Sequence, residues 1–227
     1  MRKKVIFITA AASAILLISL CACSSGGQPE LPSALTDDSS LPDEPPVEDS
    51  GSPAPGEVVV TFDFKRQSGS ASNQYAIWVE DTNGNYINTI FATKWTAEGG
   101  FKNRPDAVAA WVEKSDIPSM PDYYVDAVSG ATPRASGSLS YAWNLRDING
   151  DKVSPGEYKI LVEGTLRWKN HVLFTGEITI GDAPVTIRAD AEYFYEASDR
   201  QAALTGDSSE NAMIGAVTVS FEPAAEN

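Results

Sequence analysis

The sequence predicts an all-β protein, an antiparallel β-sandwich of about eight strands with one short inserted helix. From Glu57 onward, apolar and polar residues alternate with a period of two, as they do in strands that bury one face. Turn signals such as Asn-Gly and Pro-Gly separate the alternating runs. Hydrophobic residues make up 42% of the chain, which is enough to fill a core between two sheets.

The first run illustrates the pattern, because Val58, Val60 and Phe62 fall on one face of a predicted strand. Hairpin turns are expected at residues 82–85 and 147–151, where Asn-Gly tolerates positive φ angles. The other predicted strands are residues 75–80, 86–93, 138–145, 158–163, 172–180, 185–195 and 213–221.

One segment departs from the strand pattern. Asn103 is a candidate N-cap with Pro105 near the first helical position, and Trp111 lies on an apolar face at helical spacing. We therefore expect a short helix over residues 104–114. Residues 115–137 then form a long connection without clear periodicity, and such connections in compact domains are often functional.

The N-terminus reads as a lipoprotein signal. Residues 1–22 begin with a basic cluster and continue as an apolar run that is shorter than a typical transmembrane helix and reads as a secretory signal. Leu20 lies three residues before Cys23 and the small Ala22 directly before it, which is the pattern that lipoprotein signal peptidase accepts. We expect lipidation of Cys23. An ordinary secretory signal with incidental cysteines is the alternative.

A tether is expected to follow at residues 23–56, before a β-sandwich domain at residues 57–227. After Cys23 the tether is rich in proline and acidic residues and contains no Lys, Arg or aromatic residue. Such a segment buries too little apolar surface to offset its ordering entropy, and its like charges repel one another. The sequence therefore predicts a domain held off a membrane by a lipid anchor and an extended spacer, outside the cytoplasm.

Composition excludes several functional classes. The chain has 17 basic and 31 acidic residues, a formal charge of -14, which argues against nucleic acid as a partner. Two Cys and one His cannot build a Cys/His zinc site, an iron–sulfur site or a multi-disulfide framework. His171 falls at a predicted hairpin, where a polar residue is expected, and no nucleophile–base set accompanies it. We expect no self-contained enzyme active site.

Two other features have simple structural interpretations. The turns at residues 81–85 and 147–151 resemble calcium loops superficially, but Gly comes too early for an EF-hand loop, so hairpin turns are favoured. Tryptophans could line a carbohydrate groove, but their strand and helix positions favour burial in the core. These tryptophans are Trp78, Trp95, Trp111, Trp143 and Trp168.

Two resemblances extend this interpretation. Residues 141–163, a Trp-bearing strand, an Asp/Asn/Gly turn and a Pro-Gly-x-Tyr strand entry, resemble the immunoglobulin-like domain of flagellar hook-capping proteins. Residues 57–180 are more similar to the domain of unknown function 2271 family, with residues 76–81, the helix carrying Trp111 and residues 126–132 as matching elements. The resemblance implies an immunoglobulin-like sandwich in the cell envelope. Genes of this family tend to lie beside those for PepSY-type membrane proteins and flavin transferases, which are the implied partners.

Asp126, Ser129, Gly130, Ala131 and Thr132 also resemble the motif Asp-x-x-Ser/Thr-Gly-Ala-Thr, on which extracytoplasmic flavin transferases place FMN. This resemblance implies a phosphoester between FMN and the Thr132 hydroxyl. Asp126 would then be a docking contact, Gly130 would supply conformational freedom and Ala131 clearance. Nearby aromatic residues that could stack on the isoalloxazine ring are Tyr123, Tyr124, Tyr141 and Trp143.

A structural interpretation of the motif stays open beside this one. Asp126 and Ser129 could cap local backbone groups in a turn of the sandwich. The chain also continues with Pro133-Arg134, whereas Thr-Ser commonly follows the acceptor motif. The sequence thus supports two functions. The first is a lipid-anchored, flavin-carrying or flavin-associated electron-transfer component. The second is a non-catalytic binding or scaffold module that uses residues 115–137 as its contact surface and carries no cofactor.

Overall fold

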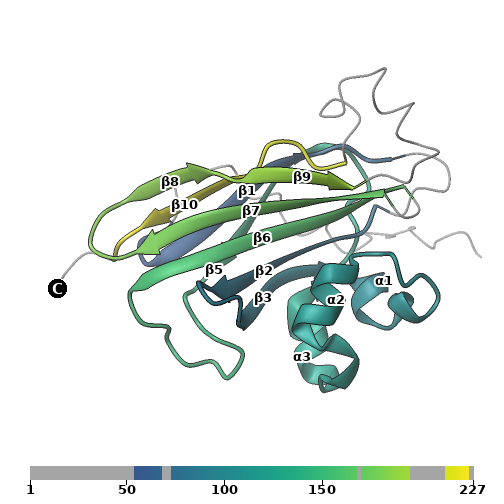
Figure 1. Cartoon of the computed structure of the whole chain (residues 1–227), viewed down its shortest axis with the longest axis horizontal. Coiled ribbons are helices and arrows are strands. Elements are labelled where there is room, and N and C mark those ends of the chain that lie inside the picture. The colour runs from purple at the N-terminus through teal and green to yellow at the C-terminus, as the bar shows by residue number, and fades with distance from the viewer. Residues whose placement is uncertain (1–53, 68–72, 168–169, 195–212, 225–227) are drawn as a thin grey trace, which may run out of the picture. The chain divides into compact units, whose positions relative to one another are not determined.

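The prediction of an all-β sandwich is confirmed by the computed structural model, which describes residues 54–67, 73–167, 170–194 and 213–224. Within these ranges ten strands form two facing sheets (Figure 1). The predicted signal peptide at residues 1–22, Cys23 and the tether as far as residue 53 lie outside the described residues. No helix in the described ranges is long and apolar enough to cross a membrane.

A four-stranded sheet forms one layer of the sandwich. Its strand order is β5-β1-β10-β8, and every neighbouring pair is antiparallel. The central strand β1 buries alternate residues along its length, as the period-two pattern predicts. The four strands are β1 (Glu57–Phe64), β5 (Gly137–Trp143), β8 (Val185–Arg188) and β10 (Thr218–Glu222).

The second layer is a six-stranded sheet with the order β4-β3-β2-β6-β7-β9. Its pairs are antiparallel, except that the short edge strand β4 runs parallel to β3. The six strands are β2 (Tyr75–Asp81), β3 (Tyr86–Thr93), β4 (Ser129–Gly130), β6 (Gly156–Arg167), β7 (Asn170–Ile180) and β9 (Asp190–Phe194).

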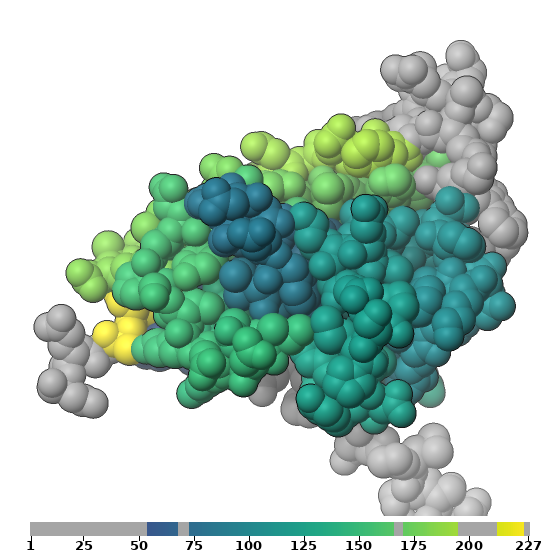
Figure 2. Space-filling model, turned by 60° about the horizontal axis from the view of Figure 1, so that its bottom comes forward, coloured from purple at the N-terminus to yellow at the C-terminus, as the bar shows by residue number. Residues whose placement is uncertain are grey.

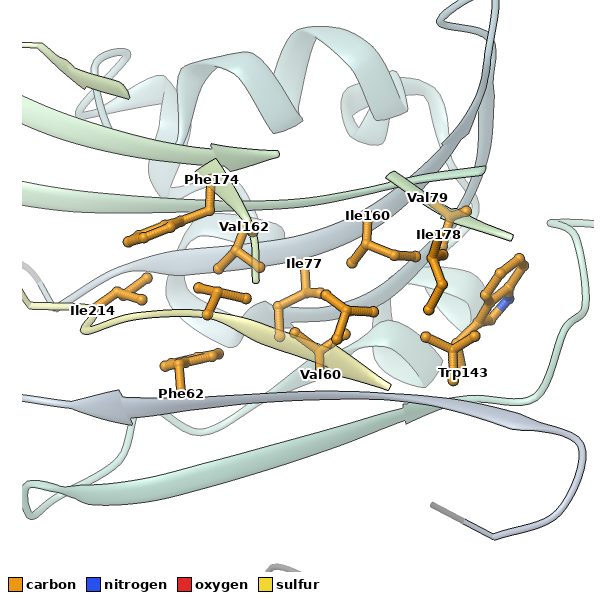
Figure 3. Close-up of a cluster of buried hydrophobic side chains, with 14 of the residues drawn as sticks. Val60, Phe62, Ile77, Val79, Trp143, Ile160, Val162, Phe174, Ile178 and Ile214 are labelled. Atoms are coloured by element: carbon orange, nitrogen blue, oxygen red, sulfur yellow. The ribbon is translucent and has the colours of Figure 1, made fainter. Parts of the chain in front are cut away.

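The main hydrophobic core lies between the two sheets. Val60 and Phe62 of the four-stranded sheet face Ile77, Ile160 and other apolar side chains of the six-stranded sheet (Figure 3). Burial of this apolar surface is the main source of stability for the sandwich. The other labelled core residues in Figure 3 are Val79, Trp143, Val162, Phe174, Ile178 and Ile214.

A second, smaller core lies on the opposite face of the six-stranded sheet. Trp78 and Leu161, which alternate with the residues of the main core, pack there against a helical segment that carries Trp111. Figure 1 shows this segment beside the six-stranded sheet. This segment connects β3 to β4. Its elements are α1 (Lys94–Ala97), η1 (Gly100–Lys102), α2 (Ala109–Ser115), η2 (Ile117–Ser119) and α3 (Asp122–Val128).

The inserted helix begins later than the sequence predicts. The expected helix over residues 104–114 with Asn103 as N-cap is wrong at its start, because α2 spans Ala109–Ser115. Val108, directly before α2, has a left-handed φ of 55° that breaks helical continuity. Its N–H donates to Oγ1 of Thr165 on β6 at 3.1 Å. A tertiary contact, rather than the local capping signal, therefore sets the start of this helix.

Two further expectations about continuity are wrong. The connection at residues 115–137 is not irregular throughout, since it contains η2, α3 and β4. The strand expected at residues 185–195 breaks at Ala189 into β8 and β9, which belong to different sheets. The buried Ala189 donates its N–H to the carbonyl of Val217 at 3.0 Å, so the chain changes sheets at that point.

Candidate functional site

The motif at residues 126–132 passes through three kinds of local structure. Asp126 is exposed on the last turn of α3, and Ser129 and Gly130 form β4, which pairs with Ala92 and Thr93 of β3. Residues 131–136, between β4 and β5, adopt neither helix nor strand. The motif therefore ends on an irregular segment at the edge of the six-stranded sheet.

Thr132, the predicted attachment residue, is partly buried on this segment. Its Oγ1 accepts a hydrogen bond from Nε2 of Gln74 at 3.3 Å. The following residues are tied to the end of β1, because the Arg66 guanidinium donates to the carbonyl of Pro133 and the Arg66 N–H donates to Oγ of Ser136 at 2.9 Å. The hydroxyl of Thr132 is thus held in a defined place on a partly buried residue.

Gln74 joins the motif to two other elements. Its Oε1 accepts hydrogen bonds from Oγ1 of Thr93 at 2.6 Å and from Oγ1 of Thr96 at 3.0 Å. Thr93 ends β3 and Thr96 lies in α1, so one amide links three separate segments of the chain. Sequence reasoning missed Gln74, which precedes a strand and lies 58 residues before Thr132.

Gly130 has a packing role instead of the conformational role that was expected. Its φ is not in the left-handed region, so glycine is not needed for backbone freedom. A Cβ at this position would lie 2.5 Å from Cε2 of Phe91. The ring of Phe91 occupies the space that a side chain at position 130 would need.

The structural interpretation of the motif expected Ser129 to cap a backbone group, but Ser129 caps none among the described residues. Its Oγ is buried and has no hydrogen-bond partner within the described residues. A buried hydroxyl without a partner costs free energy because it has lost its hydrogen bonds to water. Local hydrogen bonding therefore does not explain serine at this position.

A cluster of aromatic rings lies beside Gly130. Phe91 and Tyr141, both only partly buried, have ring centroids 4.6 Å apart. Tyr75 packs on Phe91 at 5.3 Å, and its hydroxyl contacts that of Tyr141. Burial raises the pKa of Tyr141 to about 12. Burial also raises the pKa of Tyr75. Both tyrosines therefore stay neutral at physiological pH and give the motif an apolar aromatic wall.

The other three aromatic residues expected near the motif are not part of this wall. Trp143 is buried in the main core, and its Nε1 donates to the carbonyl of Arg146. Tyr124 is buried under α3, where its hydroxyl lies 2.7 Å from that of Tyr86 and anchors the helix to β3. Tyr123 is 78% exposed on the same helix. Of the four candidates, only Tyr141 joins the cluster beside Gly130.

Comparison with known proteins assigns the chain to a family. A family model for DUF2271, described as a predicted periplasmic protein, matches residues 56–197. The chain belongs to the DUF2271 family. The match covers more than half of the chain and includes the helical segment and the whole motif, and it indicates a location outside the cytoplasm. No curated protein and no solved structure matches the chain.

The helical segment gives this DUF2271 domain a second feature of interest. A pocket of about 560 Å³ lies between α1–η1 and η2–α3. Figure 2 shows the helical segment, in teal, on the side of the molecule that faces the viewer. Phe101, Met120 and Val125 contribute apolar surface, whereas Asp122 and Asp126 place carboxylates at its wall. A volume of this size falls within the range of small-molecule pockets.

The remaining candidates have structural roles in the DUF2271 domain. His171, on β7, stacks on Phe194 of β9 at 4.4 Å. Within the described ranges no group of three or more His, Cys, Asp or Glu residues is placed to hold a metal ion. Burial of the tryptophans is confirmed for Trp78, Trp111 and Trp143, whereas Trp95 is 44% exposed on α1. Trp168 lies outside the described residues.

Proposed function

We propose that this protein is a lipid-anchored, extracytoplasmic DUF2271 domain that carries covalent FMN on Thr132 and serves as an electron-transfer component. The observation that best supports this proposal is the position of the Thr132 hydroxyl. Thr132 is a partly exposed residue on an irregular segment, and its hydroxyl accepts a side-chain hydrogen bond from Gln74. A transferase must reach a hydroxyl on an accessible segment, and Thr132 meets this requirement.

In this modification the chain itself contributes only the Thr132 hydroxyl, which is the nucleophile. A bond forms between Oγ1 of Thr132 and the flavin phosphorus, while the pyrophosphate bond of a flavin dinucleotide breaks and a nucleoside monophosphate leaves. The proton from Oγ1 goes to a base on the transferase. The cofactor then supplies the redox chemistry, and this domain supplies attachment and surroundings.

The surroundings of Thr132 suit an aromatic cofactor. The partly buried rings of Phe91 and Tyr141 lie beside Gly130, two residues before the attachment point. Aromatic rings can stack on a planar isoalloxazine at low cost in conformational entropy. Asp126 is exposed on α3 and is available as a docking contact for the transferase. Cys23 would tether the domain, and the charge of -14 favours a protein or membrane-protein partner over nucleic acid.

Intact-mass analysis tests the proposal. The full chain is co-expressed with an extracytoplasmic flavin transferase and should gain the mass of one phosphoflavin and become fluorescent. Thr132→Ala should abolish both signals. Thr186→Ala, which removes an exposed hydroxyl on β8, should leave them unchanged and serves as the matched control. A wild-type chain that remains unmodified would rule the proposal out.

A non-catalytic binding module is the second candidate, and the helical segment favours it. That segment combines a pocket of about 560 Å³ with exposed Trp95 and Tyr123. Exposed aromatic side chains beside a pocket are typical of protein contact surfaces. An unmodified wild-type chain, together with loss of binding to envelope partners on Trp95→Ala and Tyr123→Ala, would support this function instead.

A further inference from the structure

We propose that Gln74 is a positioning residue whose side-chain amide fixes the direction in which the Thr132 hydroxyl is offered to the transferase. This inference rests on the proposed flavinylation of Thr132. Gln74 is only 5% exposed, although it lies outside a strand and donates a hydrogen bond to a partly exposed residue. A polar side chain buried at the edge of a surface motif calls for an explanation beyond packing.

Two hydroxyl groups determine how the Gln74 amide is oriented. Oγ1 of Thr93 accepts the Tyr75 N–H at 3.3 Å, and as a donor it lies closer to Oε1 of Gln74 than to the carbonyl of Tyr75, which is 3.3 Å away. It donates to Oε1 of Gln74 at 2.6 Å, and Thr96 donates to the same oxygen at 3.0 Å. With Oε1 accepting from both hydroxyls, Nε2 lies on the side of Thr132 and donates to its Oγ1.

The backbone of Gln74 is held as firmly as its side chain. Its carbonyl accepts the N–H of Thr165, on β6, at 2.9 Å. The side-chain donor of Gln74 is therefore anchored to the six-stranded sheet, whereas Thr132 lies on the irregular segment. A reacting group placed by rigid elements is positioned more accurately than one placed by a loop alone.

The hydrogen bond has a specific consequence for the reaction. A threonine hydroxyl has two lone pairs and one proton. The N–H of Gln74 occupies one lone pair of Oγ1, so the other lone pair and the O–H bond are restricted to the two remaining tetrahedral directions. The free lone pair forms the bond to phosphorus, and the proton leaves toward the transferase base. Misplacing a reacting group by about 1 Å can cost about 100-fold in rate.

Initial rates of flavin incorporation test this role. Wild type, Gln74→Leu and Thr96→Val are compared as full-length chains at several chain concentrations with purified transferase and flavin dinucleotide. We expect Gln74→Leu to lower kcat at least about tenfold with little change in KM, because alignment is lost while docking is kept. Thr96→Val removes one donor to Oε1 but leaves Nε2 in place, so its rate should fall about twofold or less.

Gln74→Glu separates alignment from a merely structural role. The introduced carboxyl can still accept from Thr93 and Thr96, and when protonated it can donate to Thr132 as the amide does. Once ionised it can only accept. We therefore expect the rate of this variant relative to wild type to change with pH through the titration of the introduced group, whereas a structural role predicts a constant ratio. Thermal melting checks that each variant is folded.

The possible results are distinct. Wild-type rates in folded Gln74→Leu and a pH-independent ratio in Gln74→Glu overturn the role of Gln74 and leave flavinylation intact. A wild-type chain that never gains flavin overturns flavinylation and the role of Gln74 together. Slow incorporation in Gln74→Leu with wild-type rates in Thr96→Val supports both.

Discussion

The carboxylate of Glu163 on β6 accepts a hydrogen bond from the backbone N–H of Trp111, in the first turn of α2, at 3.0 Å. Both residues are fully buried. The first N–H groups of a helix have no partner within the helix, and a carboxylate at that end is favourable. A strand therefore caps the inserted helix, and the contact joins the helical segment to the six-stranded sheet.

Replacing this carboxylate should change how stability depends on pH. Burial raises the pKa of Glu163, and the hydrogen bond from Trp111 and the nearby His171 oppose the rise only in part. The folded state therefore holds a proton that the unfolded state releases at lower pH. Stability from Glu163 then falls as pH rises from the ordinary carboxyl pKa through the raised folded value. We expect Glu163→Gln to remove this dependence while keeping an acceptor oxygen.

Urea unfolding of wild type and Glu163→Gln at a series of pH values measures the effect. The stability of wild type relative to the variant should decrease as pH rises through that window. Glu157 is exposed on β6, and its carboxylate does not contact a helix. The stability of Glu157→Gln should therefore change with pH in the same way as that of wild type. If the free energy of unfolding of Glu163→Gln also changed with pH in the same way as that of wild type, the buried carboxylate would not titrate in this range.

The Glu163 contact shows why the sandwich was predictable and the helical segment was not. Alternation within a strand depends on neighbouring residues, so strands such as β1 and β7 could be located from the sequence. The start of α2 depends on Glu163 and Thr165, which lie more than 50 residues away in the chain. No local pattern contains that information, and the capping signal at Asn103 pointed to the wrong residue.

Substitution of Gly130 should destabilise the domain through a steric clash. A Cβ at this position would meet Cε2 of Phe91 at 2.5 Å, so Gly130→Ala should cost about 1–3 kcal/mol, as overpacking typically does. Gly137→Ala is the matched control, since a Cβ there meets nothing within 4 Å. Phe91→Leu should partly restore Gly130→Ala in a double-mutant cycle. Equal stabilities for the two alanine variants would contradict this packing role.

The candidate site, like the helical segment, was only partly predictable, because some of its residues are distant in the sequence and meet only in the folded chain. Thr132 and Gly130 could be identified because a short motif contains them. Gln74 and Phe91 could not, since they come from the segment before β2 and from β3 and meet the motif only in the folded chain. The role of Gly130 was misjudged because glycine in a motif suggests flexibility, whereas here it makes room for a ring.

Removal of the Ser129 hydroxyl should not reduce stability. The buried Oγ has no partner within the described residues, so wild type carries the cost of an unsatisfied polar group. Ser129→Ala should leave the free energy of unfolding unchanged or raise it by about 1 kcal/mol. Ser140→Ala, on β5 beside Thr61, removes a hydroxyl that has a partner and serves as the comparison. Marked destabilisation by Ser129→Ala in denaturant titrations would mean that Oγ does bind a group.

The turn after β2 should depend on the carboxylate of Asp81. Its Oδ1 accepts the N–H groups of Asn83 and Asn85, both at 2.8 Å, and Oδ2 accepts the side-chain amide of Asn85 at 2.7 Å. These hydrogen bonds, with that of the Asn85 side chain foremost, lower the pKa of Asp81. The turn containing Asp147 repeats the two backbone contacts, both at 2.9 Å. Asp81→Ala should therefore lower the melting temperature.

The pH dependence of this loss distinguishes hydrogen bonding from net charge. A carboxyl group whose pKa is lowered by folding adds stability above its ordinary pKa and loses it as pH falls through the lowered folded value. The deficit of Asp81→Ala should therefore be full at neutral pH and shrink in acid. Asp182→Ala removes the same charge from an exposed turn between β7 and β8 and should melt close to wild type throughout. Equal melting temperatures for the two variants at neutral pH would show that net charge, and not the turn geometry, governs the contribution of Asp81.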